Sequence, residues 1–181
     1  MQRDDGCLCI AERHGKTLAA YHITQGDTND CGPHVVAMAV NFWTGQQTID
    51  AHQIAQKMNR PRVKAGLPPI VVRRIPNWAT FPWGIVDMLR EYGLHARWRL
   101  WASKDDLQRA LREDHLVAPI FGEPFRRRGR WSHVALLAEW NPSTAKYYFV
   151  DSARSYPMSA YTRDELLRYW RNMGRIMVEA Y

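Results

Sequence analysis

The stretch QGDTNDCGPHVVAMAVNFWTG, residues 25–45, decides how this chain folds. Its second half is an apolar run at helical spacing, broad enough to be buried on most sides. Turn and N-cap residue types precede Cys31, and Pro33 is tolerated in a first helical turn but damaging later. We therefore expect a buried helix that begins at about Asp30 or Cys31 and ends at Thr44.

Cys31 then lies in the first turn of this helix. A thiol there is close to the positive end of the helix dipole and to unpaired N–H groups, which favour the thiolate form. Gly32 leaves room for a second backbone or a substrate, and Gln25 is six positions upstream, where its amide could fold back beside the thiol. The pattern indicates a cysteine nucleophile, although a lone cysteine before an apolar helix is often an inert small hydrophobe.

The composition is that of one globular domain. The chain has 181 residues, 46% of them hydrophobic and 12% aromatic, which excludes general disorder. We expect a polar lead-in at residues 1–20 and a single domain at 21–181. No apolar run approaches the 18 or so residues of a membrane span, and the start lacks the apolar core of a secretory signal.

Three cysteines make no disulfide framework, so a reducing, cytoplasmic location is the simplest interpretation. A piece of a larger exported protein would have the same composition. Cys7 and Cys9 form a C-x-C pair too short for usual zinc spacing, and Cys31-x-x-His34 lacks a second pair. We therefore expect no metal and no cofactor.

The chain is basic, with a formal net charge of +7 and a pI of about 9.6. A solvated basic surface explains this best. Nucleic-acid binding would depend only on the arginines and aromatics of residues 61–78, and we disfavour it.

The order of elements predicts an α+β fold, with helices first and an antiparallel sheet after them. Further helices are expected at 49–58, 82–93, 107–114 and 162–174, the last two preceded by capping boxes at Ser103/Asp106 and Thr162/Glu165. Strands are expected at 18–23, 95–101, 116–121, 131–140 and 146–151, with an edge strand in the tail at 175–181. Residues 59–80 are rich in proline and basic residues, and are expected to be irregular, with at most an extended piece at 70–72, and to form one lip of a cleft.

Two residues of the predicted sheet are of the types that a thiol nucleophile needs as partners. His133 lies near the start of one strand and Asp151 at the end of the next, where a hairpin could bring them together. A thiolate needs a base, a group that orients the base, and donors for the oxyanion. Alone, His133 would more often be structural and Asp151 a turn former.

Together these residues resemble the papain-like cysteine peptidases, and more closely the bacteriocin-processing (double-glycine-leader) peptidase family and its stand-alone relatives. The matching parts, in order, are Gln25, Asp30-Cys31-Gly32, Ser132-His133-Val134 and Asp151-Ser152. The resemblance spans residues 21–170. Ser152 stands where that family commonly has proline, and 59–80 looks like an insertion.

The resemblance implies a papain-like fold and acyl transfer on a peptide or protein substrate. Cys31 would attack the carbonyl, and Gln25 with the Cys31 N–H would stabilise the oxyanion. His133 would protonate the leaving amine and then activate water, while Asp151 holds the imidazole. Hydrolysis, deamidation and transglutamination of protein glutamine, including by a toxin or effector, remain open on the same triad.

Substrate contact is expected from Trp83, Trp131 and Gly32, which flank the predicted cleft, although both tryptophans could equally belong to the core. The run RRRGR at 126–130 is expected to be a solvated hairpin tip, with recognition of acidic substrate residues as the alternative. A non-catalytic peptide-binding module is the alternative of a different class. Such domains typically lose the cysteine, which is present here.

Overall fold

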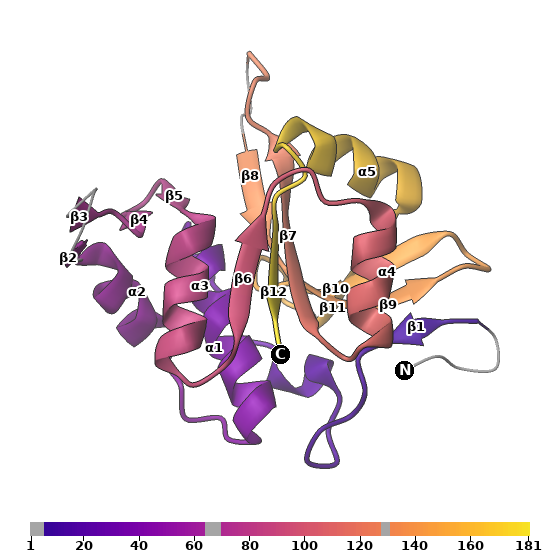
Figure 1. Cartoon of the computed structure of the whole chain (residues 1–181), viewed down its shortest axis with the longest axis horizontal. Helices are drawn as coiled ribbons and strands as arrows, with labels where there is room; N and C mark the ends of the chain where they lie inside the picture. The colour runs from indigo at the N-terminus through magenta and orange to yellow at the C-terminus, as the bar shows by residue number, and fades with distance from the viewer. Residues whose placement is uncertain (1–5, 64–69, 128–130) are drawn as a thin grey trace.

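The computed structural model describes residues 6–63, 70–127 and 131–181. Within these ranges the chain forms five α-helices and one large antiparallel sheet, so the predicted α+β class is confirmed (Figure 1). The helices are α1 (Cys31–Thr44), α2 (Ala51–Asn59), α3 (Pro82–Glu91), α4 (Lys104–Arg112) and α5 (Arg163–Asn172), with a 3₁₀ turn, η1, at Leu18–Tyr21. None of the helices in this part of the chain has the length and apolarity needed to cross a membrane.

The large sheet has the strand order β11-β10-β9-β7-β12-β6, with β1 paired to β9 and β8 paired to β7. Helices α1–α3 gather on one side of the sheet and α4 and α5 on the other (Figure 1). The strands of this sheet are β1 (Leu8–Cys9), β6 (Ala96–Arg99), β7 (Leu116–Glu123), β8 (Trp131–Val134), β9 (Leu136–Asn141), β10 (Lys146–Val150), β11 (Met158–Thr162) and β12 (Met177–Ala180).

Helix α1 has the bounds and the burial that its sequence predicts. It begins at Cys31, ends at Thr44, and is followed by Gly45 with φ 76°, a left-handed conformation that glycine adopts without strain. Every residue from position 32 to 42 is buried, because η1, α2, α3 and β8 all contact this helix. The first turn of α1 is thereby held rigidly at the edge of the core.

The two predicted capping boxes are present. The Ser103 hydroxyl accepts from the backbone N–H of Asp106, whose carboxylate accepts from the Ser103 N–H, and Thr162 and Glu165 make the same pair of bonds. These boxes explain where α4 and α5 begin.

Several expected strands differ from those observed. The strand expected at 131–140 is observed as two strands, β8 and β9, which are separated by Ala135 and both pair with β7. The tail strand β12 is wholly buried between β6 and β7, so its assignment as an edge strand was wrong. The strand expected at 18–23 is wrong too, since this segment contains the 3₁₀ turn η1, and β11 was missed.

Part of the expected polar lead-in, residues 1–20, packs against the sheet. Strand β1 pairs with β9, and the residues around it are buried against the sheet. The first five residues, and positions 128–130 of the expected RRRGR turn, lie outside the described residues.

Residues 59–80 contain more strand than expected. Two small antiparallel ladders form there: β2 (Arg62–Val63) pairs with β3 (Ile70–Val71), and β4 (Arg74–Ile75) pairs with β5 (Ala79–Thr80).

Two arginines bind the 59–80 segment to the helices. Buried Arg73 bonds Glu91 at 2.9 Å, and buried Arg74 bonds Asp30 and, at 2.8 Å, the side chain of Asn59. These two guanidinium groups are therefore committed to internal partners and not to a nucleic acid.

Tryptophan burial is only partly as expected. The amphipathic spacing of Trp43, Trp98 and Trp170 in the sequence predicts that all three belong to the core. Trp170 is fully buried and Trp43 half-buried, but Trp98 is 37% exposed, so for Trp98 the prediction was wrong. Strand β6 is the last strand of the sheet, and Trp98 there meets the ring of Trp83 instead of a second layer.

Candidate active site

The three residues predicted as a triad meet at one edge of the sheet. Cys31 opens α1, His133 is on β8, and Asp151 directly follows β10. The Nε2 atom of His133 lies 2.6 Å from Oδ1 of Asp151, and the same imidazole is hydrogen-bonded to Cys31. Since Nε2 faces the carboxylate, Nδ1 is the ring nitrogen left for the thiol. The side chains form a chain from sulfur through imidazole to carboxylate.

The surroundings of His133 favour its charged form. Burial lowers the pKa of the imidazole, but the hydrogen bonds to Asp151 and Cys31, with the charges of both, outweigh burial and raise it to about 9. The side chain is 12% exposed and lines the pocket described below. At neutral pH an imidazolium therefore lies beside the Cys31 sulfur.

Asp151 is held as a charged acceptor. It is 1% exposed, and its carboxylate accepts from the backbone N–H of Ala153 at 2.9 Å and from the Ser159 hydroxyl at 3.2 Å, besides facing His133. Burial raises the pKa of this carboxyl, but the bond and charge of His133 and the other donors outweigh it and lower the pKa. The carboxylate fixes the orientation of the ring.

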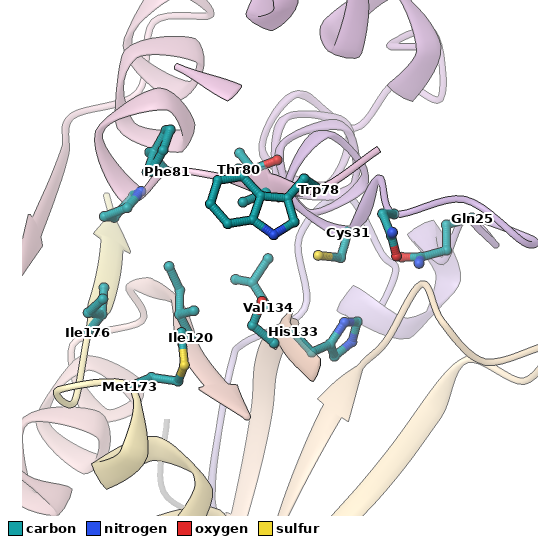
Figure 2. Close-up of a pocket in the computed structure, with 14 residues that line it drawn as sticks. Gln25, Cys31, Trp78, Thr80, Phe81, Ile120, His133, Val134, Met173 and Ile176 are labelled. Carbon is teal, nitrogen blue, oxygen red and sulfur yellow. The ribbon is translucent and has the colours of Figure 1, made fainter. Parts of the chain in front are cut away.

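Gln25 lies on the far side of Cys31 from most of the pocket, and its side chain is fixed at both ends (Figure 2). Its Oε1 accepts from the Ser152 hydroxyl at 2.8 Å, and its Nε2 donates to the Thr28 carbonyl at 2.6 Å. The backbone N–H of Gln25 also donates to the Ser152 carbonyl at 2.8 Å. The Thr28 carbonyl takes one of the two Nε2 hydrogens. The sequence analysis noted Ser152 only as a departure from the family pattern and did not predict its hydrogen bonds to Gln25.

Gly32 has a packing role. A Cβ built on it would lie 2.5 Å from the Thr80 side chain, so Thr80 occupies the room that was expected for a second backbone or a substrate. The absence of a side chain lets β5 pass directly over the first turn of α1.

The two tryptophans expected at the cleft have different positions. Trp83 lies outside the pocket lining, stacked on Phe81 at a centroid distance of 4.6 Å, and its indole N–H donates to the Val72 carbonyl at 2.7 Å. Trp131 lines a second hollow, shared with Trp78, that adjoins the pocket.

A pocket of about 230 Å³ opens beside Cys31 and His133 (Figure 2). Trp78, Ala79 and Thr80 from the end of the 59–80 segment form one side of it, which places that segment at the cleft. The sequence analysis placed Trp78 and Thr80 at the cleft only as part of the 59–80 segment, and it missed the pocket residues Phe81, Ile120, Met173 and Ile176. The only signal of these four was apolar character, which core residues share.

His34, one turn after Cys31, is buried, and its Nδ1 bonds the Asp30 carbonyl at 2.8 Å. Burial lowers its pKa more than Asp30 raises it, so the ring is neutral at pH 7.

In the described part of the chain, one cluster of residue types that could bind a metal ion is found, formed by Glu113, His115 and Glu179. Its central carboxylate, Glu179, is already bonded to arginines on β6 and α4, which makes the cluster an ion-pair network.

Comparison with known proteins gives one family and a set of similar folds. The Peptidase_C39 like family matches residues 17–178, nearly the whole chain. No curated protein matches.

Three solved structures resemble this one. A C39-like peptidase from Bacillus anthracis has 14% identity and a TM-score of 0.66 over 88% of this chain and 93% of its own. A double glycine motif protease of an AMS/PCAT transporter, solved with its leader peptide, has 15% identity and a TM-score of 0.54 over 88% and 89%. The peptidase domain of Streptococcus ComA, a bi-functional ABC transporter of a quorum-sensing pathway, has 14% identity and a TM-score of 0.57 over 88% and 97%. At these identities the likeness shows the fold.

The resemblance found in the sequence is thus confirmed by both the family match and the fold: the chain belongs to the Peptidase_C39 like family of cysteine peptidases.

Proposed function

We propose that this protein cleaves peptide bonds with Cys31 as nucleophile, His133 as acid and base, and Asp151 as the residue that orients His133. The observation that carries the proposal is the continuous chain from the Cys31 sulfur through the imidazole to the buried carboxylate. A structural histidine would not need a thiol on one nitrogen and a carboxylate on the other.

In the first half of the reaction, the Cys31 thiolate attacks the carbonyl carbon of the substrate. The oxyanion accepts from the remaining Nε2 hydrogen of Gln25 and from the Cys31 backbone N–H. The C–N bond then breaks, His133 gives its proton to the leaving amine, and a thioester to Cys31 remains.

In the second half, water attacks the thioester. His133, now neutral, takes a proton from the water, and the C–S bond breaks to release the acid and the thiolate. Asp151 stabilises the imidazolium whenever it forms. Besides the substrate and water, these steps use only side chains and one backbone N–H of the chain.

A peptide as substrate agrees with the double glycine motif protease of similar fold, which was solved with a leader peptide. His133 and the half-buried Cys31 both line the pocket, so an extended peptide can reach them.

The test is cleavage of a mixture of unstructured peptides, followed by mass spectrometry. We expect cleavage by the wild type and at least a ~10³-fold loss in Cys31→Ala and His133→Ala. His95→Ala, which removes an exposed histidine outside the site, is the matched control. Equal cleavage by Cys31→Ala and the wild type would contradict the proposal.

A further inference from the structure

The pocket beside Cys31 has a polar end and an apolar end. Gln25 and His133 lie near the sulfur (Figure 2). Figure 2 shows Ile120, Met173 and Ile176 grouped away from the sulfur, with Phe81 across from them. A ligand bound at Cys31 therefore meets hydrogen-bonding groups near the thiol and, farther in, this group of apolar side chains.

The apolar end is formed by residues that are held in place. Ile120 on β7 pairs with Val134 on β8, and its N–H donates to the Ile176 carbonyl at 3.0 Å. That same carbonyl accepts from the buried Trp170 indole at 2.7 Å. On the opposite side, Phe81 is stacked on Trp83. The pocket is thus preformed and does not depend on a ligand to assemble it.

Its size suits a large side chain. The pocket measures about 230 Å³, and an apolar cavity of roughly 150 Å³ already accommodates benzene. A leucine, isoleucine, methionine or phenylalanine side chain would exchange water for apolar contacts there. Glycine offers nothing that could fill the space.

We propose that this pocket is a specificity site for a bulky apolar side chain within two residues of the scissile bond. The inference rests on the peptidase activity proposed above and adds its substrate class. It separates this chain from a protease of double glycine motifs such as the similar structure solved with its leader peptide, because two glycines would leave the pocket unfilled.

The experiment is a cleavage-site profile. The purified full chain is incubated with a synthetic mixture of tetradecapeptides that sample neighbouring residue pairs evenly, and new termini are identified by mass spectrometry. Cys31→Ala defines the background. We expect bulky apolar residues to be enriched at one position within two residues of the cut. In a quenched fluorescent peptide built on the best site, replacing that residue by alanine should lower kcat/KM at least about 10-fold.

Two exposed tryptophans provide matched variants. Trp78 lines the pocket and is 69% exposed, whereas Trp101 is 75% exposed and outside the lining. We expect Trp78→Ala to raise KM for the apolar peptide at least about 3-fold and Trp101→Ala to leave it unchanged.

The two proposals fail differently. Cys31-dependent cleavage concentrated at glycine pairs, or without apolar enrichment, would overturn the pocket inference and leave the peptidase proposal standing. Equal effects of Trp78→Ala and Trp101→Ala would also count against the pocket. A complete lack of cleavage, with Cys31 unreactive toward iodoacetamide, would overturn the peptidase proposal and the inference with it.

Discussion

The hydroxyl of Ser152 donates a 2.8 Å hydrogen bond to Oε1 of Gln25, and the Gln25 backbone N–H donates to the Ser152 carbonyl at the same distance. Ser152 is fully buried and directly follows Asp151. One short segment therefore fixes both the carboxylate behind His133 and the amide beside Cys31. Because Oε1 accepts from Ser152, the Nε2 of the amide is the atom that donates to the Thr28 carbonyl.

Ser152→Ala should lower kcat without disturbing the thiol. Loss of one hydrogen bond frees the Gln25 amide to rotate, and we expect kcat to fall about 5- to 10-fold with KM little changed. Gln25→Ala should cost about 10²- to 10³-fold in kcat. Peptide cleavage kinetics of the single and double variants measure both effects.

The double variant distinguishes positioning from general damage. If Ser152 acts through Gln25, adding Ser152→Ala to Gln25→Ala should cost nothing further. Ser143→Ala, which removes an exposed serine hydroxyl bonded to the Asn141 amide oxygen at 2.7 Å, is the matched control. Fully additive losses would show that Ser152 does not act through Gln25.

Local patterns predicted much of the fold. The bounds of α1 and the capping boxes before α4 and α5 depend on neighbours within a few residues, and the sequence contains that information. Strand pairing joins segments that are far apart in the chain, so local patterns do not predict it. β12 reads as an edge strand until its pairing with both β6 and β7 is known.

The site shows the same division. Cys31, His133, Asp151 and Gln25 were predicted because they belong to a spaced motif, and the structure brings their side chains together. The pocket wall could not be predicted, since Ile120 and its apolar neighbours come from distant segments and look like core residues. Gly32 was assigned to substrate, whereas only the structure places Thr80 in that space.

Activity should fall as the pH rises through about 9. His133 must carry a proton for the leaving amine, and its pKa is raised from 6.5 to about 9, so the protonated form persists through neutral pH and is lost above 9. The hydrogen bond and charge of Asp151 raise this pKa, so Asp151→Asn should move the basic limb to lower pH. Profiles of kcat/KM against pH for both proteins measure the shift. A limb that stays in place would mean that Asp151 does not set this pKa.

Gly32→Ala should destabilise the fold. The new methyl would lie 2.5 Å from Thr80, so β5 or α1 must move. We expect a loss of about 1–3 kcal/mol in the free energy of unfolding, measured by urea denaturation. Combining it with Thr80→Gly removes the clashing atoms and should recover part of that loss. A loss unaffected by Thr80→Gly would place the strain elsewhere.

Arg74→Met should weaken both stability and the site. It leaves the Asp30 carboxylate, next to Cys31, without its ion-pair partner, at a cost of about 3–5 kcal/mol in unfolding free energy. Adding Asp30→Asn removes the unpaired charge and should restore part of the stability. Arg127→Met, at an exposed arginine, is the control and should change the urea midpoint little.

The most direct test of the central claim is the rate at which Cys31 reacts with limiting iodoacetamide at pH 6, mapped by mass spectrometry. Cys7 and Cys9 are buried, at 1% and 4% exposure, and should label slowly in the folded protein and readily once it is unfolded. The account predicts fast labelling of Cys31 and at least a ~10-fold slower rate in His133→Ala, because the imidazolium stabilises the thiolate. Slow labelling of Cys31 in the wild type, or a rate unchanged by His133→Ala, would contradict it.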